Sequence, residues 1–162
     1  MHKIKLASLL ALSITLVGAL CVPSKANTAC RATTIAGTYG FRGNGFGGGD
    51  GNDAERVPAF FPSAATGEIS FTATSHTGGT LSGSESLSFG GLQFSLTFTG
   101  TYTVNAPTCA GSITATFQNG GSPTLDFVIV KGGEDIYFHQ TNPGAVFHGV
   151  MTKESNKESN DD

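Results

Sequence analysis

The chain has 162 residues with nine basic and twelve acidic side chains, a net charge of −3, and 23 glycines and 12 phenylalanines but no tryptophan. This length suits a single domain. The acidic balance leaves no basic stripe that could neutralise phosphates, so we expect no nucleic-acid partner.

Residues 1–26 are predicted to be a secretory signal peptide. They contain a basic start, an apolar run from Ile4 to Val22 and an A-x-A-like ending that favours cleavage after Ala26. A membrane anchor is the alternative, although the apolar run is short and no stop-transfer pattern follows it. The bulky Leu20 disfavours a lipoprotein cysteine at Cys21. Cleavage would remove three lysines and leave a secreted or periplasmic chain of 136 residues with a net charge of −6 and no membrane span.

Two cysteines remain after this cleavage, Cys30 and Cys109. An even pair in an exported chain predicts one disulfide, which closes a long loop and stabilises the fold by roughly 2–4 kcal/mol. Two free buried thiols are the alternative, which an oxidising compartment disfavours.

Apolar and polar residues alternate with period two through most of the mature chain, and glycine, serine and threonine dominate. Such alternation is typical of β-strands with one buried face, and helical periodicity is absent. The pattern is clearest in residues 91–104, where hydroxyl and amide side chains occupy one face. The other face carries Leu92, Phe94, Leu96, Phe98, Gly100, Tyr102 and Val104.

Eight strands with short turns between them predict an all-β domain over residues 27–152. We expect an antiparallel up-and-down barrel, with a β-sandwich as the alternative. Eight strands enclose a lumen that side chains fill or that holds one small ligand. An inverted barrel with apolar side chains facing lipid is a further alternative. The expected strands cover 37–43, about 57–74, 80–89, 91–104, 111–118 and three segments within 126–150.

The C-terminal residues 153–162, KESNKESNDD, contain a repeat of KESN and no apolar side chain. A segment of this composition has no means of burying apolar surface. It is therefore predicted to be a disordered tail.

Four segments resemble the signature segments of allene oxide cyclase-like barrel proteins, whose secreted bacterial members are mostly of unknown function. The resemblance implies an eight-stranded barrel of the calycin type. The plant members cyclise an unsaturated fatty-acid epoxide in an apolar cavity and are oligomers, but their catalytic residues have no counterparts that we can assign in this chain. The segments are GTYGFR (37–42), GTYTVNAPTCAG (100–111), DFVIV (126–130) and IYFHQTNPG (136–144).

Two turn signals near the C-terminal end predict a pair of hairpins. Two-residue loops at Gly132-Gly133 and Pro143-Gly144 would align Asp126, His139 and His148 in a row across three strands. Such a row could bind a metal or relay protons. These three residues alternate with the apolar residues of their strands, which are expected to face the lumen. The row should therefore lie on the outer wall, in contact with water. A three-residue second loop would instead separate the two histidines.

The same outer wall is unusually apolar. An apolar surface on the outside of a barrel favours packing on another part of the chain or on a second copy of it. We therefore predict a homo-oligomer through the last three strands, using Val128, Val130, Tyr137, Val146 and Val150.

Polar residues at inward-facing positions are the better candidates for a binding site. Glu85 shares its face with Leu81, Leu87 and Phe89, so its carboxyl group would be desolvated. An outward bulge at Glu85, and core tyrosines bonded to backbone, are the alternatives. The predicted ligand-binding residues in the lumen are Tyr39, Glu85, Tyr102 and Gln140.

The glycine-rich segment 43–55 is expected to be a loop or a lid over the barrel mouth. Residues 48–54, GGDGNDA, match the start of a calcium-binding nonapeptide repeat, with oxygens available from Asp50, Asn52, Asp53 and Glu55. There is one copy, and Glu55 stands where an apolar residue belongs. We therefore predict no metal site.

Motifs for nucleophilic catalysis, zinc, phosphate or dinucleotide binding are absent from the sequence, so no cofactor is predicted. The favoured function is non-catalytic binding of a small apolar molecule or of a protein partner. The alternative is an isomerase or cyclase that acts on a lipid-derived substrate in the lumen. That alternative requires Glu85 and a tyrosine hydroxyl to converge.

Overall fold

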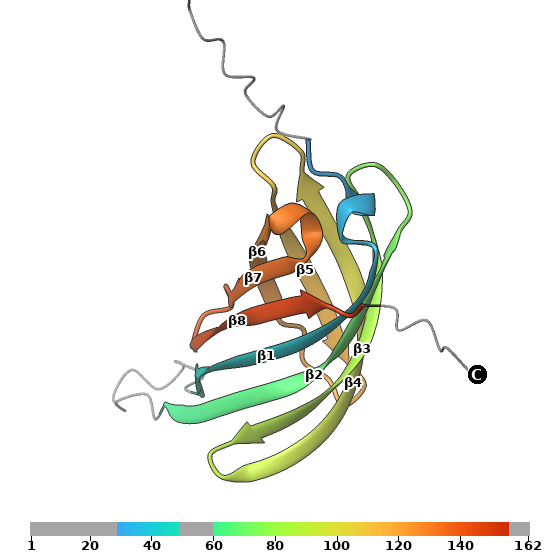
Figure 1. Cartoon of the computed structure of the whole chain (residues 1–162). Coiled ribbons are helices and arrows are strands. Elements are labelled where there is room, and N and C mark those ends of the chain that lie inside the picture. The colour runs from blue at the N-terminus through green and yellow to red at the C-terminus, as the bar shows by residue number, and fades with distance from the viewer. Residues whose placement is uncertain (1–28, 49–59, 156–162) are drawn as a thin grey trace, which may run out of the picture.

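The computed structural model describes residues 29–48 and 60–155. Its eight strands form a closed antiparallel barrel in which each strand pairs with its neighbours in sequence and β8 closes on β1 (Figure 1). The up-and-down barrel is therefore confirmed, and the β-sandwich is wrong. The strands are β1 (Gly37–Gly47), β2 (Phe61–Ala73), β3 (Gly78–Phe89), β4 (Leu92–Asn105), β5 (Ala110–Phe117), β6 (Thr124–Val130), β7 (Asp135–Gln140) and β8 (Ala145–Lys153).

The wall is uneven in height. The β3 and β4 strands have 12 and 14 residues, whereas β6 and β7 have seven and six. The β4 strand pairs with β5 only from Phe98 onward, so the outer part of the β3–β4 hairpin extends beyond the shorter strands. Figure 1 shows this extension at the end of the barrel opposite the N-terminal helix.

Glycines at positive φ make the tightest turns. Gly90 and Gly91, at φ +56° and +87°, join Phe89 to its partner Leu92. Two consecutive residues at positive φ match the right-handed twist of a hairpin, and glycine adopts that conformation without a steric cost. The backbone geometry of this turn therefore explains why both of its residues are glycine.

The predicted register of the last three strands is confirmed. Asp126 pairs with His139, and His139 pairs with His148. Lys131 begins a short 3-10 turn, η2 (Lys131–Gly133), at φ +49° and forms an ion pair with Asp135 at the start of β7 (2.6 Å).

Every second side chain of each strand points into the barrel, and these inward side chains are mainly apolar. Phe98, Phe127 and Phe138 are buried there, whereas the serines and threonines between the inward positions of β3 and β4 are mostly exposed. The inverted barrel is thus wrong for the described strands. Phe94 has the inward parity but remains 41% exposed, because it lies on the extension of the β3–β4 hairpin.

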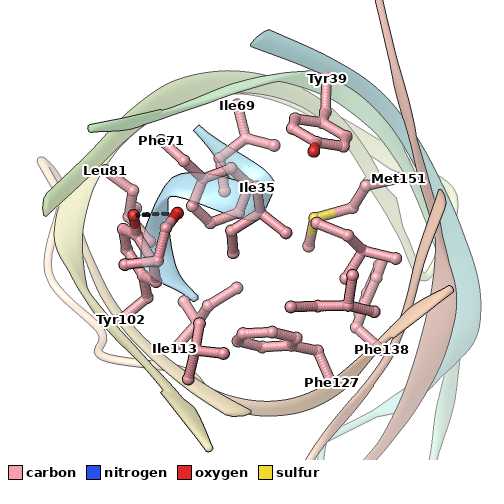
Figure 2. Packing of buried hydrophobic residues seen from close by; sticks show 14 of the residues in the cluster. Ile35, Tyr39, Ile69, Phe71, Leu81, Tyr102, Ile113, Phe127, Phe138 and Met151 are labelled. Carbon is pink, nitrogen blue, oxygen red and sulfur yellow. Dashed lines mark hydrogen bonds between the residues drawn. The ribbon is translucent and has the colours of Figure 1, made fainter. Parts of the chain in front are cut away.

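A short 3-10 helix, η1 (Ala32–Ile35), closes one end of the barrel. Ile35 is fully buried, and Figure 2 shows it near the centre of the ring of inward-pointing side chains. The Ala32 amide donates to the His76 carbonyl (2.9 Å), which attaches η1 to the β2–β3 turn. The apolar side chains at this end therefore pack around a plug that the chain itself supplies.

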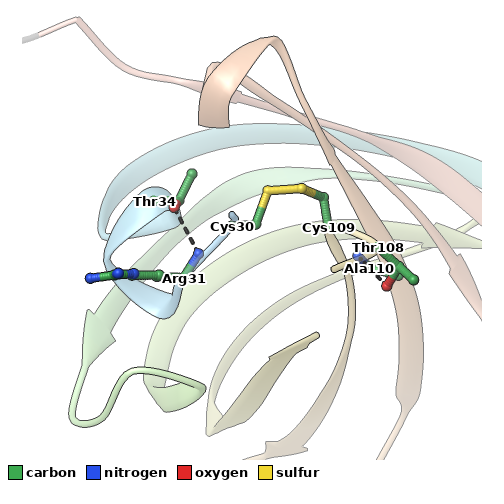
Figure 3. The surroundings of a disulfide bond; sticks show 6 residues. All are labelled: Cys30, Arg31, Thr34, Thr108, Cys109 and Ala110. Atoms are coloured by element: carbon green, nitrogen blue, oxygen red, sulfur yellow. Dashed lines mark hydrogen bonds between the residues drawn. A yellow bond between two sulfur atoms is a disulfide. The ribbon is translucent and has the colours of Figure 1, made fainter. Parts of the chain in front are cut away.

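The disulfide between Cys30 and Cys109 is present, with the Cα atoms 5.2 Å apart. It joins a residue just before η1 to the turn that leads into β5 (Figure 3). The cross-link therefore holds the plug against the closed end of the wall.

Two predicted boundaries differ from the structure. The β1 strand continues through Gly47, so residues 43–47 of the segment expected to be a loop belong to the barrel wall. The β8 strand continues through Lys153, and the Glu154 amide donates to the Thr38 carbonyl (2.9 Å), so the ordered wall extends past residue 152. The predicted signal peptide and most of the predicted tail lie outside the described residues. Within the described part of the chain, no helix has the length and apolar character needed to cross a membrane.

Candidate functional site: an apolar cavity at the open end

The end of the barrel opposite η1 contains a cavity of about 530 Å³. Its floor is formed by Ile69, Ile113 and Met151, which belong to the same buried core that packs around the plug. A volume of this size falls within the roughly 300–1,000 Å³ of ordinary small-molecule sites. The apolar lining includes Phe41, Ala65, Leu87, Phe89, Phe98, Ala115, Phe117, Leu125, Phe138 and Phe147.

Aromatic rings lie over glycines of neighbouring strands. Phe41 pairs with Gly67, and a Cβ atom on Gly67 would lie 2.8 Å from the Phe41 ring. The same arrangement joins Phe98 to Gly83, at 2.5 Å, and the Phe138 ring lies 2.6 Å from the Cβ position of Gly149. Because glycine leaves room at the wall, each ring lies against its neighbouring strand, and space remains along the barrel axis.

Glu85 lines this cavity, as predicted from its parity. On β3 it pairs with Gly67 of β2 and with Leu96 of β4, so glycine and leucine flank the carboxyl group. Burial raises the pKa of Glu85 above its usual value, because the wall withholds water from the charged form.

Gln140 also lines the cavity, and it belongs to a network with Asn142. The Thr124 amide donates to Asn142 Oδ1 (2.6 Å), which identifies that atom as the amide oxygen; Gln140 Nε2 donates to the same oxygen (3.3 Å). Asn142 Nδ2 donates in turn to the Ser122 carbonyl (3.4 Å). These bonds engage the amide nitrogen of Gln140 and leave its carbonyl oxygen available to other hydrogen-bond donors.

Sequence reasoning assigned Asn142 only to a turn. Asparagine before Pro-Gly often bonds its side chain to nearby backbone, and that tendency was the available signal.

The β7 strand stands four places from β3 in the closed order of eight strands. Gln140 and Glu85 consequently lie on opposite walls of the cavity.

The two predicted tyrosines lie elsewhere, at the closed end. The Tyr39 hydroxyl donates to the Gly133 carbonyl (2.6 Å). The Tyr102 hydroxyl donates to the Ala32 carbonyl (3.2 Å), and Figure 2 draws this second bond as a dashed line. Both rings are buried, and neither lines the cavity. Desolvation, followed by the nearby charge of Glu134, raises the pKa of Tyr39 to about 12. Of the four predicted lumen residues, the structure therefore brings Glu85 and Gln140 to the cavity. Tyr102 instead bonds to the plug, and Tyr39 bonds to η2.

The row of Asp126, His139 and His148 forms on the outer wall, where all three side chains are exposed. No cluster of three or more potential metal-ligating side chains occurs in residues 29–48 and 60–155. The proposed calcium ligands Asp50, Asn52, Asp53 and Glu55 lie outside the described residues.

The apolar outer wall of the last strands is present as expected. Val128, Tyr137 and Val146 are 40%, 51% and 60% exposed, and Tyr137 pairs with Val128 on one side and Val150 on the other. Val130 and Val150 are half-buried. Oligomerisation through this face stays a prediction, which sedimentation equilibrium would test.

No protein-family model and no curated protein matches the chain. Solved structures of designed barrels are similar to it in fold. A de novo designed fluorescence-activating β-barrel has a TM-score of 0.55 at 14% identity and covers 76% of this chain and 96% of its own. The barrel EF1p2_mFAP2b bound to DFHBI has a TM-score of 0.57 at 11% identity over 79% of this chain and 98% of its own.

A redesigned barrel, mFAP0, also bound to DFHBI, has a TM-score of 0.54 at 13% identity over 74% of this chain and 99% of its own. At these identities the likeness concerns the fold alone. The resemblance to allene oxide cyclase-like proteins is not tested by these structures.

Proposed function

We propose that this protein binds a small apolar molecule in the open-end cavity without transforming it. The observation that carries the proposal is a hollow of about 530 Å³ with a mainly apolar lining above a solidly packed floor. A barrel whose sole requirement was stability would fill this space, since an unfilled apolar lining forgoes packing contacts and stays in contact with water. The designed barrels that bind DFHBI support the proposal, because they place a ligand in the same kind of fold.

The buried tyrosine hydroxyls do not converge with Glu85 at the cavity, and this separation favours binding over catalysis. An isomerase that used Glu85 would need a second polar group beside the substrate, and the hydroxyls of Tyr39 and Tyr102 are bonded to backbone at the closed end. Opposite walls separate Glu85 from Gln140. Binding is therefore proposed in preference to a cyclase or isomerase reaction.

We further propose that the protein acts outside the cytoplasm. The Cys30–Cys109 bond supports this placement, because such bonds persist in oxidising compartments. The basic start and apolar run of the predicted signal peptide point the same way. We also propose membership of the allene oxide cyclase-like barrels, which the four resembling segments support.

The test is a pair of adjacent substitutions that place the same ring on the two faces of one strand. Ala65 points into the cavity, whereas its neighbour Ala64 is exposed on the outer wall. Ala65→Phe fills part of the cavity, and Ala64→Phe adds the ring outside. Each variant and the wild type would be titrated with the neutral apolar dye Nile red, and binding would be followed by fluorescence.

We expect wild type and Ala64→Phe to bind the dye with equal affinity and Ala65→Phe to bind it about tenfold more weakly or not at all, since steric exclusion removes contacts worth at least about 1.4 kcal/mol. Circular dichroism would establish that Ala65→Phe retains its strands. Equal binding by folded Ala65→Phe, or no binding by the wild type, would refute the proposal.

A further inference from the structure

The cavity carries charge of one sign. Among the described residues that line it, Glu85 is the sole ionisable side chain, and the other polar side chains are serines and amides. Arg42, His139 and His148 are exposed on the outer wall. At the closed end, Lys131 pairs with Asp135, and Lys153 lies over the Tyr39 ring. None of these basic side chains faces Glu85.

The strands beside Glu85 offer it no titratable partner on the inner face. On β2 the inward neighbours are Ala65, Gly67 and Ile69, and on β4 they are Phe94, Leu96 and Phe98, the direct partners being Gly67 and Leu96. Glu68 of β2 lies on the outer face and is exposed. An ionised carboxylate in these surroundings lacks both a counter-charge and full hydration, which is unfavourable until an occupant supplies a donor.

The opposite wall also presents an acceptor. Since Asn142 Oδ1 accepts from Thr124 and from Gln140 Nε2, the Gln140 side chain is oriented with its carbonyl oxygen available. A ligand in the cavity therefore meets hydrogen-bond acceptors on two sides. Groups that donate are favoured there, and a second carboxylate would enter a desolvated space that already contains one negative charge.

We propose that the cavity selects apolar molecules that end in a protonated amine, with Glu85 as the counter-ion, and that it rejects apolar carboxylates such as fatty acids. This inference rests on the proposed function and adds the chemical class of the ligand. It also separates this barrel from a binder of free fatty acids, which would need a cation where Glu85 stands.

Three probes with the same ten-carbon chain test the proposal: decylamine, decanol and decanoate. Each would be used below its micellar concentration, at pH 7.5, to displace Nile red. We expect decylamine to bind about tenfold or more tightly than decanoate, with decanol between them, because a partly desolvated ion pair or like-charge contact is worth at least about 1.4 kcal/mol.

Glu85→Gln and Glu68→Gln form the matched pair of variants. Both remove one negative charge from adjacent strands, but Glu85 lines the cavity and Glu68 lies outside. Glu85→Gln should abolish the preference for decylamine while leaving decanol binding in place. Glu68→Gln should behave as the wild type, which controls for attraction of cations to an acidic protein.

The outcomes separate this inference from the proposed function. If decanoate binds as well as decylamine, or if the preference survives in Glu85→Gln, the amine assignment is overturned while apolar binding stands. If neither the dye nor any of the three probes binds, the proposed function itself fails. A preference confined to proteins that retain Glu85 supports both.

Discussion

The two ends of the barrel use the same alternating strands for different purposes. At the closed end, Ile35 of η1 fills the axis, buried Tyr102 bonds to the backbone of the plug, and buried Tyr39 bonds to the backbone of η2. At the open end, rings lie against glycines, the axis is empty and Glu85 faces the space. From this comparison we expect stability to be concentrated at the plug, and the proposed binding site lies in the half that should contribute less to stability.

The largest expected effect comes from truncating the plug. Ile35→Ala should lower the free energy of unfolding by about 2–5 kcal/mol, because the side chain is fully buried and its cavity has no means of collapsing easily. Leu87→Ala, at the half-exposed cavity wall, should cost no more than about 1 kcal/mol. Urea unfolding measures both. Equal losses would contradict the division of the barrel into a stabilising end and a binding end.

Removal of the disulfide should have the next largest effect. The Cys30→Ser, Cys109→Ser double variant should lose about 2–4 kcal/mol, because the bond closes a loop with a sequence separation of 79. Its melting temperature should fall by roughly 10 °C. Calorimetry gives both quantities, and Nile red affinity per folded molecule should stay unchanged because the bond lies at the far end.

Tyr39→Phe should cost about 1–3 kcal/mol, since it leaves the buried Gly133 carbonyl without its donor. The pKa of Tyr39 is raised to about 12, above its ordinary value of 10.0. The tyrosine therefore contributes its full stability below pH 10 and loses it as the pH rises from 10 towards 12. Urea midpoints measured through this range should fall more for wild type than for Tyr39→Phe; parallel curves would refute the assignment.

The smallest expected effect is a gain in stability rather than a loss. Burial raises the pKa of Glu85, so its ionisation destabilises the folded chain as the pH rises through the ordinary carboxyl range. Glu85→Gln should therefore be more stable than wild type at pH 7, and this gain should disappear at low pH. Glu68→Gln should show no such gain. A loss of stability in Glu85→Gln at pH 7 would mean that the carboxylate has a favourable partner.

Much of this arrangement could be read from residue patterns. The inward parity of Glu85 follows from Leu81, Leu87 and Phe89 on the same strand, and the register of Asp126 with His139 follows from the Gly132-Gly133 turn. Both are local consequences of period-two geometry and turn chemistry. Residues 32–35 gave no comparable signal, because a four-residue 3-10 helix is too short for a periodic pattern.

The sequence by itself determined the number of strands, their faces, the registers of the last two hairpins and the pairing of Cys30 with Cys109, although β1 runs on to Gly47 beyond its predicted end. Tertiary structure decided which end is plugged and which is hollow. It placed Tyr39 and Tyr102 at the closed end, bonded to the backbone of η2 and of the plug, and it left Glu85 and Gln140 at the cavity. The physical reason is that parity specifies the face of a strand but not the height along the barrel axis. That height depends on where a distant segment such as η1 packs.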